Sequence, residues 1–217
     1  MNRYFSEVAR VIRSLGVTSP FDEESNLLQA DYRESPLCTI GTNGIRYHPD
    51  HIDTEAKKKL LDQIEDKRRV ISEYINAYEK APPLTAEGLG DGYRLLAEYN
   101  RVVLAAKDMD KHGYQFATWN RTYGDTGLTH GHYSFDYESA KEDFAIRSGM
   151  VDENKLFTDE QMNDIYRAVN YFRWENEDIT DKQDAAMKDI MEKIEYAIPG
   201  AESVLGTEQS SGMGMNM

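Results

Sequence analysis

Two histidines separated by one glycine, His130 and His132, have the spacing in this chain that best suits metal chemistry. In an extended strand, residues i and i+2 point to the same face, so both imidazoles can reach one ion. A further ligand is needed, and Asp136 or His112 is available. Strand histidines among Tyr and Trp more often pack structurally. A metal-dependent enzyme using His130 and His132 is therefore the alternative hypothesis, not the leading one.

The other reactive side chains follow no catalytic pattern. Cys38 falls in a short apolar run that predicts a strand, where a thiol is a small core residue. His48 and His51 stand on either side of Asp50, in a turn before a long helical pattern. The chain has no nucleophile elbow, zinc-protease helix, phosphate-binding loop or dinucleotide fingerprint. We therefore predict a non-enzymatic protein without a cofactor.

The net charge is −14, from 39 acidic and 25 basic side chains. Such an excess of acid argues against general binding to nucleic acid or to an anionic membrane, both of which select Lys and Arg. No apolar run approaches the length of a membrane span, and the N-terminus lacks an apolar signal core. The single cysteine cannot form an intramolecular disulfide, which favours a reducing compartment. We expect a soluble, cytoplasmic protein.

The acidity is concentrated near the C-terminus. Residues 136–208 hold 19 acidic and 8 basic side chains, so they supply most of the net charge. Carboxylates in the first turn of a helix are favoured by the unpaired N–H groups and the helix dipole, which accounts for Asp159, Glu160 and Asp181 without a partner. The acids that follow Trp174 need another explanation.

An aromatic side chain beside several carboxylates suits docking into an Arg-lined groove. An acidic surface can bind the basic surfaces that other proteins use to hold nucleic acid. We therefore predict a protein-binding site in this region. Its members are Trp174, Glu175, Glu177, Asp178, Asp181 and Asp184.

Three segments give the chain a familiar appearance: Phe-Ala-Thr-Trp at 116–119, Gly-His-Tyr at 131–133, and Ala-Lys-Glu-Asp-Phe-Ala-Ile-Arg-Ser-Gly at 140–149. With residues 156–161 and the earlier segments 36–38 and 45–47, the chain resembles an uncharacterised family of accessory proteins. That family is carried on conjugative elements and prophages of gut Firmicutes. The resemblance covers most of the chain but includes no catalytic motif.

The resemblance implies a setting on a mobile genetic element. Small acidic proteins of such elements often counter host defence, as anti-CRISPR and antirestriction proteins do. The leading hypothesis is an anti-defence inhibitor that occupies a basic nucleic-acid-binding surface, for example on a CRISPR nuclease such as Cas9. A third hypothesis is an accessory subunit of the conjugation machinery.

The apolar spacing predicts an α+β fold in two parts. Residues 1–81 form an α-β-β-β-α unit, with helices over 3–15 and 54–80 and three short strands between them. Residues 93–199 form a mainly antiparallel four-stranded sheet and three helices, with Leu95–Ala106 alternatively helical. Asp136, Thr158 and Thr180 are the expected helix N-caps, the last two with a capping box. Residues 82–92 are the expected linker, and 200–217 a disordered tail.

Overall fold

The computed structural model describes residues 2–176 and 178–201. It is a mixed helix and strand protein, 47% helical and 26% strand, which confirms the predicted α+β class. The chain forms two compact units, residues 1–151 and 152–217. The boundary between them lies after Val151 and not within residues 82–92, which belong to the first unit. In the residues that the structure describes, no helix is long and apolar enough to cross a membrane.

The first unit begins with helix α1 (Arg3–Ile12), whose N-cap is Asn2, and a short 3-10 turn that ends at Gly16 in the left-handed conformation. Sheet A follows, and all its pairs are antiparallel. Its strands are β1 (Val17–Thr18), β2 (Phe21–Asp22), β3 (Leu27–Tyr32), β4 (Ser35–Gly41) and β5 (Gly44–Arg46). The last three are the predicted strands, and the two-residue strands β1 and β2 are additions that both pair with β3.

Helix α2 (Glu55–Lys80) begins after the N-cap Thr54, as predicted, and has 26 residues. At 1.5 Å per residue it is about 39 Å long, long enough to pack on both sheets. Its N-terminal part buries Leu60, Leu61 and Ile64, and its C-terminal part places Tyr74 against sheet B. Ala81 leaves the helix in an extended conformation because Pro82 and Pro83 follow.

Sheet B is an antiparallel meander in sequence order. Its strands are β6 (Tyr93–Tyr99), β7 (Val102–Asp108), β8 (Tyr114–Arg121) and β9 (Leu128–Ser134). Asn100 and Arg101 both have positive φ, which is the two-residue turn that joins twisted strands. The alternative helix over 95–106 is therefore wrong. Residues 102–106 of β7 are buried on both faces, so the alternation that identifies a half-exposed strand is lost.

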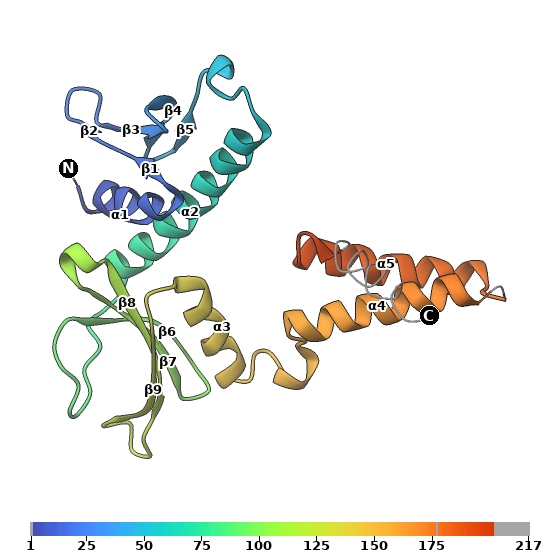
Figure 1. The fold of residues 1–217 in the computed structure, drawn as a ribbon. Coiled ribbons are helices and arrows are strands. Elements are labelled where there is room, and N and C mark those ends of the chain that lie inside the picture. The colour runs from blue at the N-terminus through green and yellow to red at the C-terminus, as the bar shows by residue number, and fades with distance from the viewer. Residues whose placement is uncertain (1, 177, 202–217) are drawn as a thin grey trace, which may run out of the picture. The chain divides into compact units, whose positions relative to one another are not determined.

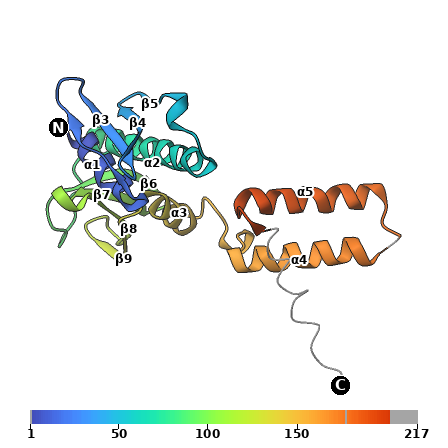
Figure 2. The same ribbon diagram turned by 45° about the horizontal axis from the view of Figure 1, so that its top comes forward.

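The main core lies between the two sheets, where α1 and α2 are packed (Figures 1 and 2). Leu28 and Ile40 of sheet A, Phe5 of α1, Ile71 of α2 and Phe116 of β8 all belong to one hydrophobic cluster. Helix α3 (Tyr137–Arg147), which Asp136 caps as predicted, packs on β7 and β8 and completes this cluster. The two predicted parts of the first 151 residues therefore share one core.

The other face of sheet B is covered by the segment 82–92, which is the predicted linker. Leu84 of this segment is buried with Val103 and Trp119. Its amide donates to the carbonyl of Tyr93, and Glu87 forms a bridge to Gly127. Glycine and proline make the segment irregular, but backbone hydrogen bonds and apolar contacts make it part of the first unit.

The second unit is a helical hairpin. A short 3-10 turn (Glu153–Lys155) leads to α4 (Asp159–Glu175), and α5 (Asp181–Ala197) follows. Both predicted capping boxes are present, with Thr158 and Gln161 on α4 and Thr180 and Gln183 on α5. Of the predicted disordered tail, residues 202–217 lie outside the described residues, whereas Ala201 is buried in the hairpin core.

Candidate functional site

The hairpin that carries the predicted binding residues is held together by a small interior. Tyr166 of α4 packs with Met191 and Ile194 of α5, and its hydroxyl donates to Glu195 Oε1 at 2.6 Å. Nearer the turn, Arg173 Nε donates to Asp184 Oδ1 at 2.9 Å. These contacts align the two helices side by side and antiparallel, so the turn between them is the free end of the hairpin.

The predicted residues gather at this free end. Trp174 lies in the last turn of α4 with its side chain 80% exposed, and its Nε1 donates to Asn170 Oδ1 at 3.2 Å. Glu175 is the last residue of α4, Asp178 is exposed in the turn, and Asp181 is the first residue of α5. Glu177 lies outside the described residues. We name Trp174, Glu175, Asp178 and Asp181 the acidic tip.

Asp184 has a different position from the other predicted residues. It is half-buried and accepts from Lys188 at 2.7 Å and from Arg173 at 2.9 Å. The hydrogen bond from Lys188, followed by that from Arg173, holds the pKa of this carboxyl below its usual range. Asp184 therefore joins the two helices, and its negative charge is balanced within the hairpin.

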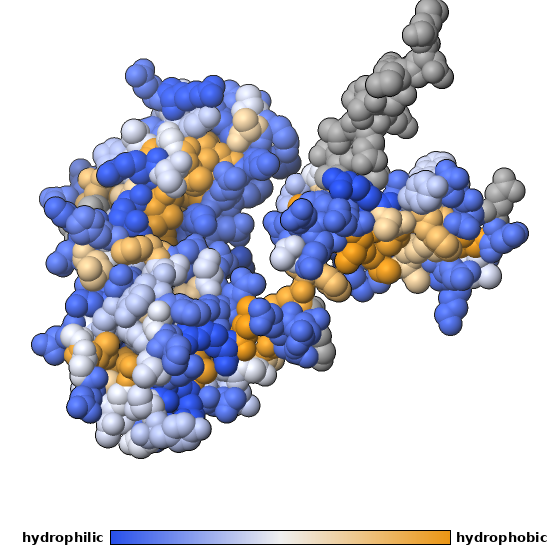
Figure 3. Space-filling view, turned by 60° about the horizontal axis from the view of Figure 1, so that its bottom comes forward, coloured by the Kyte–Doolittle hydropathy of each residue, from blue (hydrophilic) through white to orange (hydrophobic). Residues whose placement is uncertain are grey.

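Large hydrophobic side chains are exposed on the hairpin besides Trp174. They are Leu156, Phe157, Tyr171, Phe172, Ile190 and Tyr196. In Figure 3, hydrophobic side chains gather along the hairpin in the view shown. Sequence reasoning identified Trp174 but did not predict that these other residues form an exposed surface. The signal was present: α4 and α5 carry more apolar positions than one helix–helix contact can bury.

The histidines of the metal hypothesis lie on β9 at an irregular point of sheet B. Thr118 pairs with His132, whereas Asn120 pairs with Thr129, so β9 has an extra residue opposite Trp119. His130 itself has a φ of 53°. This bulge removes the simple i, i+2 alternation on which the shared face depended. Among the described residues, no group of three His, Cys, Asp or Glu side chains is placed to hold a metal ion.

His132 instead belongs to a polar cluster that ties α3 to sheet B. Its Nδ1 lies 2.8 Å from Asp143 Oδ1, and the other carboxylate oxygen accepts from the Thr118 hydroxyl. Arg147 donates to Thr118 Oγ1 at 2.7 Å and to the carbonyl of His130 at 2.6 Å. Burial raises the pKa of Asp143, but the hydrogen bonds from Thr118 and His132 outweigh it, and the pKa is lowered.

The cluster borders a hollow of about 170 Å³ that also includes Ser134 and Ser139. The hydroxyl of Ser134 accepts from the amide of Asp136, and Ser139 donates its amide to the Asp136 carboxylate. These groups serve the start of α3. A histidine–carboxylate pair is therefore present, but each serine has a local structural role, and within the described part of the chain no nucleophile is hydrogen-bonded to the histidine.

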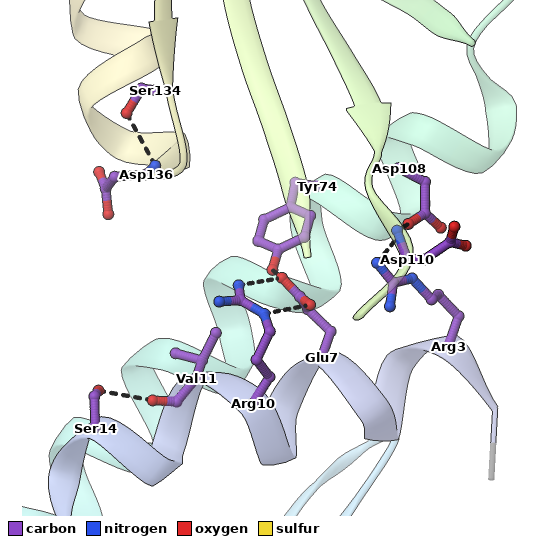
Figure 4. Close-up of polar contacts among 10 residues, drawn as sticks. All are labelled: Arg3, Glu7, Arg10, Val11, Ser14, Tyr74, Asp108, Asp110, Ser134 and Asp136. Atoms are coloured by element: carbon purple, nitrogen blue, oxygen red, sulfur yellow. Dashed lines mark hydrogen bonds and ion pairs between the residues drawn. The ribbon is translucent and has the colours of Figure 1, made fainter. Parts of the chain in front are cut away.

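A second polar cluster joins α1 to α2 (Figure 4). Glu7 is only 1% exposed, and its carboxylate accepts from Arg10 at 2.7 and 2.9 Å and from the Tyr74 hydroxyl at 2.7 Å. Burial raises the pKa of Glu7, yet the hydrogen bonds from Arg10 and Tyr74 outweigh it and lower the pKa. Nearby, Arg3 pairs with Asp108 at 2.5 Å. These paired charges connect elements of the core, which is a structural role.

Cys38 lines a hollow of about 320 Å³ on sheet A together with His48, His51 and Arg46. Burial raises the pKa of its thiol to about 12, so the reactive thiolate is scarce at neutral pH. His48 accepts from the Asp50 amide at 3.3 Å, which fits the predicted turn. Cys38 is therefore a core residue in this fold.

Comparisons of the chain with family models, with curated proteins and with solved structures give no match. The arrangement of the described side chains is thus the basis on which the candidate surfaces are weighed. The acidic tip differs from the two polar clusters because its carboxylates and its aromatic ring face solvent.

Proposed function

We propose that this chain is a non-enzymatic binding protein whose acidic tip occupies a basic surface of another protein. The observation that carries the proposal is Trp174, 80% exposed at the free end of the hairpin with carboxylates on both helices beside it. Its ring makes one hydrogen bond, to a side chain of its own helix. An exposed indole of this kind is a common centre of protein interfaces.

The carboxylates of the tip suit a partner rich in arginine. Glu175 and Asp178 are exposed, and neither has a cation paired with it among the described contacts. Arginine can form bidentate hydrogen bonds with a carboxylate and can stack on an indole ring. Carboxylates at the same end of the hairpin as Trp174 offer both interactions. The net charge of −14 adds long-range attraction to a basic partner and speeds association at low salt.

A basic groove that holds nucleic acid is the partner surface with this chemistry. The family resemblance adds a setting, in which such a groove belongs to a host defence nuclease, including CRISPR nucleases. Occupying the groove would inhibit the nuclease without a chemical step. This proposal is favoured over a metal-dependent enzyme because it uses groups that face solvent, among them Glu175 and Asp178, which pair with no cation among the described residues.

The test is a pull-down of candidate defence nucleases with the tagged full chain, at low and at high salt, followed by titration of any partner. We expect binding that weakens with salt. The variant Asp178→Lys/Asp181→Lys should bind at least tenfold more weakly, because two attractive charges become repulsive. Trp174→Ala should cost about 2 kcal/mol or more of binding free energy.

A matched control separates the tip from overall charge. Glu23→Lys/Asp62→Lys changes the net charge by the same amount at exposed positions of the first unit, and it should leave affinity within about twofold of the parent. Equal loss in both double variants would mean that only net charge matters and would reject the tip. Partners from the conjugation machinery in place of a nuclease would reject the anti-defence setting while leaving the tip to be mapped.

A further inference from the structure

The outer surfaces of the two hairpin helices carry the same spacing of residues with opposite charges. On α4 the stripe is Asp164, Ala168, Phe172 and Glu175; on α5 it is Lys182, Ala186, Ile190 and Lys193. Steps of three or four residues place neighbours along one side of a helix. Each helix thus has one small and one large apolar residue between two charged residues. The charged residues are acidic on α4 and basic on α5.

These stripes are not the contact between α4 and α5 within one hairpin. That contact is made by Tyr166, Met191 and Ile194, which are buried. In contrast, Phe172 is 48% exposed and Ile190 is 39% exposed, and both alanines are exposed. Each helix of the hairpin therefore has an apolar surface that is not covered by the other helix of the same hairpin.

The stripes are complementary when α4 of one hairpin lies antiparallel to α5 of another. The Arg173–Asp184 ion pair fixes which residues of the two helices are level. Nine residues before Arg173 is Asp164, and nine residues after Asp184 is Lys193. Two residues after Arg173 is Glu175, and two before Asp184 is Lys182. Acid is thus level with base at both ends of the stripe.

The apolar positions match in the same alignment. Phe172 is within one residue of the level of Ala186, and Ile190 is within one residue of the level of Ala168. A large side chain therefore faces a small one at both central positions. This alternation lets helices approach closely and fill the space between them.

A two-fold axis parallel to the helices does not change the position of any residue along the helix axis. The alignment of α4 with α5 within one hairpin therefore also holds between α4 of one copy and α5 of the other. This axis places α4 against α5 of the second copy on both sides and forms a four-helix bundle. A two-fold axis across the helices would instead place α4 against α4, with Asp164 and Glu175 facing carboxylates. Charge selects the first arrangement.

The size of the face is sufficient for a modest association. Two helices of 17 residues, each about 25 Å long and about 10 Å apart, present a face of roughly 500 Å². Two copies bury roughly 1,000 Å² in total, which is near the lower end for a specific interface. From these observations we propose that the chain forms a homodimer through the Phe172 and Ile190 face of its hairpin.

Dimerisation goes beyond the proposed function and gives it a further property. The two acidic tips lie at the same end of the bundle, so the dimer presents two tips to one partner. The acids of the two tips lie on neighbouring helices about 10 Å apart, which is slightly more than the screening length of about 8 Å at physiological salt. Salt therefore screens much of the repulsion between the tips.

The test is sedimentation of the full chain over about 1–200 µM, with circular dichroism as the check on folding. We expect a monomer–dimer equilibrium for the parent chain. The variants Asp164→Lys/Glu175→Lys and Lys182→Glu/Lys193→Glu should each dimerise roughly tenfold or more weakly. Asp164 and Lys193 also pair with Arg167 and Asp189 on their own helices, so helix content is measured for each variant.

Mixing the two variants is the decisive measurement. In the mixed dimer, each Lys stripe meets a carboxylate stripe, so a heterodimer should form with an affinity near that of the parent. This recovery depends on α4 contacting α5 of the other copy, and a variant that had merely unfolded would not show it. A parent chain that stays monomeric throughout, or variants that dimerise like the parent, or a mixture that does not recover, would each overturn the proposal.

The dimer test and the partner test can fail separately. Asp178→Lys/Asp181→Lys has the same change in net charge as Asp164→Lys/Glu175→Lys, but its substitutions lie off the stripe. It should remain a dimer while losing partner binding. Glu175 belongs both to the acidic tip and to the α4 stripe, so the tip variant leaves it unchanged.

Discussion

The two units of this chain bury their hydrophobic residues to very different degrees. In the first unit, α1, α2, α3 and one face of each sheet share a core that includes fully buried side chains such as Phe5, Leu28 and Phe116. In the hairpin, the core cluster is Tyr166, Met191, Ile194 and Ala201, with a few half-buried neighbours. Buried apolar area is the main source of folding stability, so the first unit has the larger hydrophobic contribution to its stability.

The hairpin depends more on local interactions. Both helices have capping boxes, and ion pairs such as Arg173–Asp184 align them. Each of these contributes modestly, about 1 kcal/mol for a good cap and less for an exposed pair. A segment that is stabilised locally can keep aromatic side chains on its surface. Under the proposed function, the first unit is the scaffold and the second carries the recognition surface.

The largest expected effect comes from truncating one phenylalanine in each unit and comparing the losses in the free energy of unfolding. Phe116→Ala should lower the free energy of unfolding by about 4 kcal/mol, because it opens a cavity beside Tyr74 and Tyr137. Phe172→Ala should cost less than about 1 kcal/mol when the chain is dilute enough to be monomeric, since the ring is already half in water. Chemical denaturation followed by circular dichroism measures both. Similar losses would mean that the hairpin face is buried in the monomer.

The buried carboxylate of the first unit gives a second test. Glu7→Gln should cost about 2 kcal/mol at neutral pH, because it weakens charge-assisted hydrogen bonds from Arg10 and Tyr74. The folded-state pKa of Glu7 is lowered from its ordinary value of about 4.5. Its contribution to stability is therefore complete above that value and is lost as the pH falls through the folded-state pKa. The Gln variant should show a smaller loss of stability than the parent over that acidic range.

Unfolding curves at neutral pH and at decreasing acidic pH measure both effects. Glu142→Gln, at an exposed position with no ion pair among the described residues, is the control and should follow the parent closely. An acid sensitivity unchanged in Glu7→Gln would show that other carboxylates govern it.

The smallest effect is expected in the hairpin interior. Tyr166→Phe removes the hydroxyl that donates to Glu195 but keeps the buried ring, so it should cost about 1 kcal/mol. Hydrogen exchange should accelerate in α4 and α5 and stay unchanged in sheet B, because the units have separate cores. Faster exchange in both units would show that the two cores unfold together.

Local sequence determined the elements wherever a short-range signal was strong. Thr158 with Gln161 and Thr180 with Gln183 gave the starts of α4 and α5, and Asn43-Gly44 gave the β4–β5 turn. Such signals depend on residues only a few positions apart, so no knowledge of the tertiary fold was needed. The concentration of acid near the C-terminus and the placement of Trp174 beside it were also set by the sequence alone.

Tertiary packing decided what depends on distant residues. It joined the predicted halves in one core, folded residues 82–92 onto sheet B, and inserted the bulge that separates His130 from the regular pairing of His132. It also divided the predicted acids, because Asp184 meets Arg173 across the hairpin whereas Glu175 and Asp178 stay in solvent. Burial and ion pairing depend on which surfaces meet in three dimensions, and residue spacing along one element does not contain that information.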